Sequence, residues 1–242
     1  MYNQSNYSTP SYGSFGRQQA ITSAFPVLMK KVFTWMALAL TITGLTAFVI
    51  SQSPEVMYAI ASNKIVFWGL ILGEFGLVMW LSAGINRMSL LTATLLFILY
   101  SVINGVTLSF IFLAYTMSSI ASVFFITAGT FGAMAVLGYI TKTDLSSFGK
   151  ILFMALVGLI IATIVNIFLQ STGLQMICSY AGVLIFTGLT AYDTQKIKKM
   201  LANANDYDEA AHKYAVLGAF ILYLDFINLF VYLLRIFGGR RD

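Results

Sequence analysis

Seven long apolar runs, separated by short polar connections, constrain this chain more than any other feature of its sequence. Each run is close to the roughly 20 residues that a helix needs to cross the hydrocarbon core of a bilayer. A backbone in lipid must satisfy its own hydrogen bonds, so each run is predicted to be a helix. A closed β-barrel is excluded because the runs are continuously apolar rather than alternating. The predicted spans are residues 32–50, 65–83, 90–113, 120–140, 151–169, 174–192 and 215–237.

Composition supports the same class of protein. Of the 242 residues, 59% are hydrophobic and only 10% are charged, whereas soluble domains carry about 25% charged residues. The net charge of +5 does not indicate nucleic-acid binding, because the basic residues lie at the ends of the apolar runs rather than in one patch. We therefore predict an all-α integral membrane protein whose main surroundings are membrane lipid.

The polar ends of the chain set the expected domain organisation. Residues 1–24 are rich in Asn, Gln, Ser, Tyr and Gly, and such a segment cannot bury enough apolar surface to order itself. It also lacks the basic start and apolar core of a cleaved signal peptide. We expect a flexible tail over residues 1–24, one seven-helix transmembrane domain over residues 25–239, and a short C-terminal tail over residues 240–242.

The distribution of Lys and Arg predicts an orientation, since cytoplasmic loops carry the excess of these residues. With the N-terminus inside, one side holds Arg17, Lys30, Lys31, Arg87, Lys142, Lys150, Lys196, Lys198, Lys199 and Lys213. The other side holds Lys64, Arg235, Arg240 and Arg241. The bias favours a cytoplasmic N-terminus. The C-terminal arginines would fit better if the last segment were re-entrant, yet that segment is long enough to cross.

Two carboxylates within the apolar runs are the main functional signal. Asp225 lies near the centre of the last span, AVLGAFILYLDFINLFVYLLRIF, with Asn228 one helical turn further on. Asp193 lies at the end of the preceding apolar segment, directly after residue 192. A mid-membrane Asp costs about 2.5–3.5 kcal/mol on insertion scales, so it normally faces a partner or a water-filled cavity. If the two acids approach closely they would share a proton and titrate as a unit.

The same acids also suit a cation. Carboxylate oxygens are the ligands that a hard ion such as Ca²⁺ prefers, and two or three of them without a full cage predict weak binding suited to passage. Glu74, in the second span, could supply a third oxygen along the path. Structural alternatives remain: Asp193 could pair with Lys196, and Glu74 with Arg87 or a polar neighbour. The span asparagines could serve only as interhelical contacts.

No resident cofactor is expected. Cys178 and His212 are the single cysteine and the single histidine, so neither a disulfide framework nor a histidine or cysteine metal site is available. Glycine-rich phosphate loops, metalloprotease helices and nucleophile elbows do not occur in the sequence.

Three segments resemble the Bax inhibitor-1 family, also called the transmembrane Bax-inhibitor-motif family, and its bacterial members in particular. These segments are TAYDTQKIK at residues 190–198, LYLDFINLFVYLLRIFG at residues 222–238 and TKTDLSSFGKILFMALVGLIIATIVNIFLQ at residues 141–170. The resemblance implies seven helices with the last one central and wrapped by the other six. For a bacterial member it implies the inner membrane.

The resemblance also implies a function, a pH-sensitive calcium leak in which a pair of aspartates gates the path. Those aspartates match Asp193 and Asp225, each within its own motif. An acid of the second helix matches Glu74, and Arg87 is the nearest candidate for an arginine that latches the aspartates in the closed state. Calcium is then the permeant ion, and protons are the regulator.

Two other classes of function compete with a channel. One is a regulatory protein that binds and restrains a membrane protease or a cell-death factor, with the N-terminal tail as the contact. The other is an intramembrane aspartyl protease, which would use the acids of consecutive spans. Such enzymes need a glycine-rich approach to the second Asp, whereas Leu222, Tyr223 and Leu224 precede Asp225. We therefore do not expect an enzyme.

Overall fold

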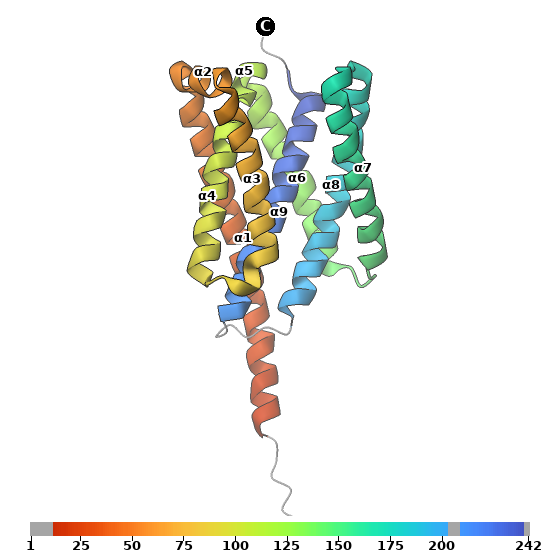
Figure 1. Cartoon of the computed structure of the whole chain (residues 1–242). Coiled ribbons are helices and arrows are strands. Elements are labelled where there is room, and N and C mark those ends of the chain that lie inside the picture. The colour runs from red at the N-terminus through yellow and green to blue at the C-terminus, as the bar shows by residue number, and fades with distance from the viewer. Residues whose placement is uncertain (1–11, 203–208, 240–242) are drawn as a thin grey trace, which may run out of the picture.

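The structure, a computed structural model, describes residues 12–202 and 209–239, with side chains from residue 25 onward. The regular elements in this part of the chain are helices (Figure 1). The helices are α1 (Tyr12–Ser51), α2 (Pro54–Ser62), α3 (Lys64–Gly84), the 3₁₀ turn η1 (Ile85–Arg87), α4 (Leu90–Leu108), α5 (Ile111–Ala114), α6 (Met117–Ile140), α7 (Ser146–Leu169), α8 (Thr172–Leu201) and α9 (Glu209–Phe237).

The predicted seven-span, all-α architecture is confirmed. Seven helical stretches in the described residues are long and apolar enough to cross a membrane. They run Phe25–Ser51, Lys64–Arg87, Leu90–Ala114, Met117–Ile140, Ser146–Leu169, Thr172–Leu201 and Glu209–Phe237. The predicted tail of residues 1–24 stays a prediction, because residues 1–11 lie outside the described residues and only the helical backbone is described for residues 12–24. The predicted C-terminal tail, residues 240–242, also lies outside them.

Three local features differ in detail from the sequence-based prediction. The connection after the first span is not simply a loop, because it contains α2, which begins with Pro54 and buries Met57. The third span is confirmed as one membrane-crossing stretch, Leu90–Ala114, but its helix is interrupted between α4 and α5. Helix α8 continues past the apolar run to Leu201, because its polar last turns still bury Ile197 and Leu201. Asp193 is therefore an interior residue of α8 rather than a helix-end residue.

Polar residues between the apolar runs begin the helices. The side chain of Asn63 accepts hydrogen bonds from the backbone N–H groups of Ile65 and Val66 at the start of α3. Hydroxyls do the same at three further helix starts, where they satisfy N–H groups that have no partner inside the helix. These capping residues are Ser89 for α4, Thr116 for α6 and Ser171 for α8.

Helix α9 is the central helix, as predicted. It packs against α1, α4, α6 and α8, while α3 packs mainly against α4, and α7 against α8. In its most apolar window 67% of the residues are buried, the largest share of the seven spans, compared with 6% for α3 and 11% for α7. Figure 1 shows α9 running through the bundle, with the C-terminal end emerging opposite the start of α1. The outer helices therefore hold lipid-facing side chains, and α9 holds the protein core.

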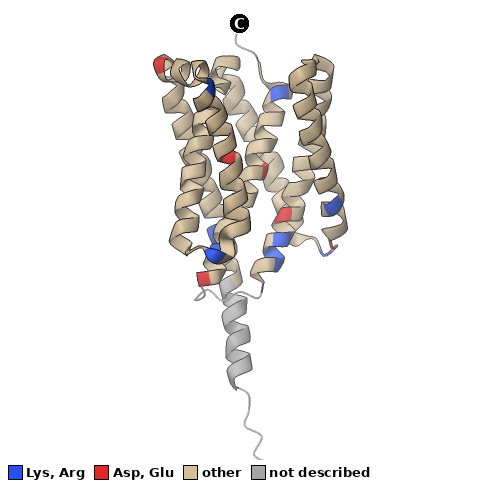
Figure 2. Ribbon diagram, viewed as in Figure 1, with Lys and Arg blue, Asp and Glu red and all other residues tan. Residues whose placement is uncertain are grey.

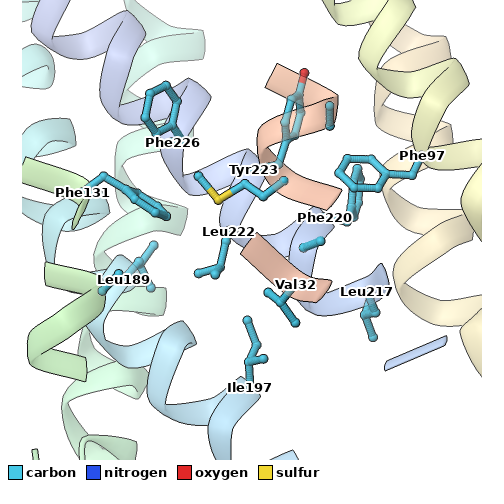
Figure 3. Close-up of a cluster of buried hydrophobic side chains, with 14 of the residues drawn as sticks. Val32, Phe97, Phe131, Leu189, Ile197, Leu217, Phe220, Leu222, Tyr223 and Phe226 are labelled. Carbon is cyan, nitrogen blue, oxygen red and sulfur yellow. The ribbon is translucent and has the colours of Figure 1, made fainter. Parts of the chain in front are cut away.

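Aromatic rings fill the core where α4 meets α9. Phe97 and Tyr100 of α4 contact Phe220 and Tyr223 of α9 edge to face, with ring centroids 5.1–5.9 Å apart. Figure 3 shows Phe97, Phe220 and Tyr223 turned toward one another. Edge-to-face pairs add about 0.5–1.5 kcal/mol each beyond their buried area, so this cluster fixes how α9 sits against α4.

Small residues allow α6 and α8 to approach closely. A Cβ atom added at Gly138 of α6 would collide with the backbone carbonyl of Ala191 in α8. Close backbone approach is the usual role of small residues between membrane helices. Gly129, on the same helix, has open space where its Cβ would be.

We predict that Gly138→Ala destabilises the protein by about 1–3 kcal/mol, because the helices must separate to admit the methyl group. Gly129→Ala is the matched control and should leave stability unchanged within about 0.5 kcal/mol. Thermal unfolding in detergent, followed by far-ultraviolet circular dichroism, measures both. Equal midpoints for the two variants would contradict the packing described here.

The turn between α6 and α7 is clamped to the end of α8. The Gln195 amide donates to Thr143 O at 2.8 Å, and its carbonyl oxygen accepts from Leu145 N at 2.9 Å. Lys199 Nζ donates to Asp144 Oδ1 at 2.5 Å. This hydrogen bond, with a smaller contribution from Ser146, lowers the pKa of Asp144 to about 2.

We predict that Lys199→Met returns the pKa of Asp144 toward the ordinary range of an aspartate, since the hydrogen bond is the main cause of its low value. Because the pKa of Asp144 is lower in the folded state, its ionised form stabilises the fold above the unfolded pKa of about 3.9. This stabilisation is lost as pH falls through about 2. Asp144 therefore adds no pH dependence to the free energy of unfolding near neutral pH. Carboxyl NMR titration in micelles checks the shift, and an unchanged pKa in the variant would refute the assignment.

Candidate functional site

The antiparallel packing of α8 and α9 brings Asp193 and Asp225 together. Phe186 of α8 stacks on Tyr232 of α9 with ring centroids 5.8 Å apart. Seven residues, or two helical turns, separate Phe186 from Asp193, and seven separate Tyr232 from Asp225. Because the helices run in opposite directions, this register places the two acids at the same level. Figure 1 shows the two helices side by side.

The two carboxyl groups are buried and face each other. Asp193 is 8% exposed and Asp225 is 5% exposed, and they approach closely enough for a side-chain hydrogen bond. Among the described residues, Asp225 Oδ2 is a fully buried oxygen that lacks a hydrogen-bond donor. Two ionised carboxylates have no donor between them, so a proton held by one of them would supply the bond that the pair lacks.

A cavity of about 760 Å³ adjoins the pair. Its walls come from α3, α4, α7, α8 and α9, and most of them are apolar. The polar groups that line it besides the two acids are Asn228, Lys150 and Lys196, together with tyrosine side chains. The amide of Asn228 donates to Leu224 O at 2.8 Å. The carboxyl pair is thus buried in protein on one side and borders a partly open cavity on the other.

Lys196 is the cation whose charge acts on the pair. It lies one turn after Asp193 on α8 and interacts electrostatically with both acids. Its side chain is exposed and its ammonium lies 5.9 Å from the ring centroid of Tyr192. Arg87, the sequence-based candidate for a latch, lies exposed at the end of η1. Within the described residues, Arg87 forms no ion pair with either aspartate.

Glu74 lies apart from the pair. The hydroxyl of Thr107 in α4 donates to Glu74 Oε1 at 2.6 Å, and Asn104 of the same helix also interacts with this carboxylate. Glu74 is not one of the residues that line the cavity, whereas its helix neighbour Phe75 is. Tyr100 lines the cavity and interacts electrostatically with Glu74. Glu74 therefore adjoins the cavity wall without facing the aspartates directly.

A second polar network holds the opposite face of α9, and sequence reasoning did not identify it. The hydroxyl of Tyr223 donates to Asn104 Oδ1 at 3.0 Å and lies 2.8 Å from the hydroxyl of Thr43 in α1. Thr43 in turn donates to Ser101 O at 2.9 Å. A signal was present, since Ser101, Asn104 and Thr107 recur every three residues and so share one face of α4.

We predict that Tyr223→Phe lowers the free energy of unfolding by about 1–2 kcal/mol, because Asn104 Oδ1 is then buried without a donor. Tyr180→Phe is the control, since Tyr180 is exposed. Equilibrium unfolding in mixed micelles measures both variants. A Tyr223 variant as stable as the Tyr180 variant would show that the network carries no net stabilisation.

The described part of the chain brings together no group of three or more His, Cys, Asp or Glu side chains that could hold a metal ion. Ca²⁺ prefers six to eight oxygen ligands. Two carboxylates and one amide therefore offer a hard cation a weak, transient site at most.

The fold and the paired acids define a class of protein: an integral membrane bundle of seven helices whose central last helix carries a buried carboxylate opposite a second one. Comparison with known proteins gives the family. Residues 26–242 match the family model described as "Inhibitor of apoptosis-promoting Bax1". The chain belongs to the Bax inhibitor-1 family.

Bacterial relatives match over nearly their whole length. The Escherichia coli K12 "Inner membrane protein YbhL" is 50% identical over 214 residues, which cover 88% of this chain and 92% of that protein. A Borreliella burgdorferi protein is 49% identical over the same coverage. A Rickettsia prowazekii protein is 45% identical over 217 residues, 88% of this chain and 90% of that protein.

Proposed function

We propose that this protein is a pH-sensitive calcium leak channel gated by protonation of the Asp193–Asp225 pair. The observation that carries the proposal is the pair itself, two buried carboxyl groups within hydrogen-bond reach beside a cavity. The resemblance of both motifs to those of calcium-leak members of the family supports it.

The proposed gate rests on the low dielectric around the pair. Two negative charges close together in an apolar bundle repel strongly, so both acids cannot ionise at low free-energy cost. A shared proton relieves the repulsion and joins α8 to α9 through a hydrogen bond. Removing or adding protons changes the net charge of the pair, and with it both the attraction for a cation and the contact between the two helices.

The proposed ion path runs through the cavity. Asp193, Asp225 and Asn228 offer oxygen ligands in it, and so few ligands favour passage over storage. Lys150 and Lys196 line the same space, and their positive charge opposes cation entry while they point inward. Long Lys side chains can swing toward the interface. Glu74 would extend the path if Tyr100, which lines the cavity beside it, moved aside.

The proposed location is a bacterial inner membrane with the N-terminus in the cytoplasm. One relative is named as an inner membrane protein. Lys and Arg lie toward the ends of the bundle, and Figure 2 shows several of them at the end where α1 enters. An excess of such residues is typical of the cytoplasmic side. In this orientation α9 crosses fully, and its last residue, Phe237, lies at the other side.

The test is calcium flux into proteoliposomes that hold a calcium dye, measured between about pH 6 and pH 8, where a carboxyl pair that shares a proton can titrate. Wild-type protein should show a pH-dependent flux. Asp193→Asn and Asp225→Asn should each bring the ratio of fluxes at the two pH values to about 1, because an amide cannot exchange the proton. Asp144→Asn removes a carboxylate outside the bundle and should behave as wild type.

An unchanged pH response in both pair variants would refute the gate. Purified wild-type protein without calcium flux at any pH would refute the channel. That second result would instead favour the regulatory class, in which the protein binds a membrane protease or a cell-death factor. Co-purification of a partner that is lost on deleting residues 1–24 would then identify the contact.

A further inference from the structure

A second cavity lies on the other side of α9, between α1 and α6. It is a groove of about 590 Å³, within the usual range of ligand pockets. Phe226 of α9 and Phe131 of α6 lie in its walls, with ring centroids 5.5 Å apart. Both side chains are labelled in Figure 3. All of its lining residues are apolar except Lys30 and Tyr139, which lie at one end.

The length of the groove matches one leaflet of a bilayer. On α1 the lining residues extend from Pro26 past Lys30 to Leu40. Ten residues separate Lys30 from Leu40, which corresponds to about 15 Å along a helix. Half of the hydrocarbon core is also about 15 Å thick. The groove therefore runs from the interface, where the basic residues stand, to about the middle of the membrane.

The interfacial end of the groove is positively charged. Lys30 lines it and is exposed. Lys198 of α8 donates to the carbonyl of Tyr139 at 2.6 Å, and its ammonium lies 5.1 Å from the centroid of that ring. The only nearby acid that the structure describes on this turn, Asp144, is already paired with Lys199. Two cations beside an apolar slot suit an acidic headgroup with an acyl chain.

Small residues keep the groove open. Gly132 lies in its wall with nothing within 4 Å of the position that a Cβ would occupy. Ala128 and Ala135 line the same wall of α6. A large side chain at Gly132 would therefore fill the groove without meeting the backbone of a neighbouring helix. Gly129, one turn away, also has open space at its Cβ position but is not one of the groove residues.

We propose that this groove binds one anionic phospholipid, with an acyl chain between α1 and α6 and the headgroup phosphate between Lys30 and Lys198. The leaflet-length slot accounts for the chain, and the two cations account for the preference in headgroup. The site lies on the face of α9 turned toward α1 and α6, whereas the carboxyl pair lies between α9 and α8. Its occupation does not require the channel function.

The experiment is native mass spectrometry of the purified full-length protein, titrated with phosphatidylglycerol or with phosphatidylcholine of the same acyl chains. Wild-type protein should bind one phosphatidylglycerol in preference to phosphatidylcholine. Gly132→Leu should weaken this binding by at least about tenfold, because it removes buried acyl-chain contact. Gly129→Leu, the matched control, should bind as wild type.

Charge variants test the headgroup. Lys30→Gln should reduce the preference for phosphatidylglycerol by about fivefold, as expected for one basic residue near an acidic headgroup. Lys64→Gln, a change of the same charge at the far end of the bundle, should leave it intact. Size-exclusion chromatography verifies that every variant remains folded and monodisperse before the titration.

Two outcomes would overturn the proposal. Equal phosphatidylglycerol binding by the Gly132 and Gly129 variants would place the lipid elsewhere. A dimer mass in wild-type protein that Gly132→Leu alone abolishes would assign the groove to a second copy of the chain. Both outcomes are independent of calcium flux, so they leave the proposed channel function to its own test.

Discussion

The antiparallel contact between α8 and α9 is the interaction on which the site depends. Neither aspartate is tolerable alone in lipid, since a lone mid-membrane carboxylate costs several kcal/mol or must find a partner. Together, held at one level by the Phe186–Tyr232 stack two turns away, they form a unit that one proton can satisfy. The aromatic cluster on α4 and the hydroxyl network of Tyr223 hold the other face of α9. The orientation of Asp225 is thus fixed from both sides of its own helix.

Much of this arrangement could be predicted from the sequence. Apolar runs of membrane-spanning length have few alternatives in a bilayer, so the number of spans and their helical state followed from hydropathy. The resemblance to the Bax inhibitor-1 family added the central position of the last helix. The free-energy cost of placing the Asp225 carboxylate in an apolar run indicated that this residue must have a partner. The family motif around Asp193 indicated which residue that partner is.

Other features could not be predicted, because hydropathy indicates whether a segment is apolar enough to be buried but not which side chains it contacts. The amphipathic last turns of α8 carry Lys198 and Lys199, so they resemble a loop although Ile197 and Leu201 anchor them in the core. The resemblance made Arg87 the nearest candidate for a latch. The structure instead places Lys196, which the sequence offered only as a structural partner of Asp193, where its charge acts on both acids. The two cavities depend on the spacing between packed helices, and this spacing cannot be predicted from the sequence of any one helix.

Burial is uneven across the bundle, and this has a mechanical consequence. Half or more of the residues in the most apolar windows of α8 and α9 are buried, whereas few of those in α3 and α7 are. Segments with few buried contacts need the least free energy to shift. Phe75 and Val78 of α3 and Phe153 and Met154 of α7 form part of the wall of the carboxyl cavity. Helices α3 and α7 therefore need the least free energy to move. A displacement of either helix toward the lipid would widen this cavity while α9 stays in place.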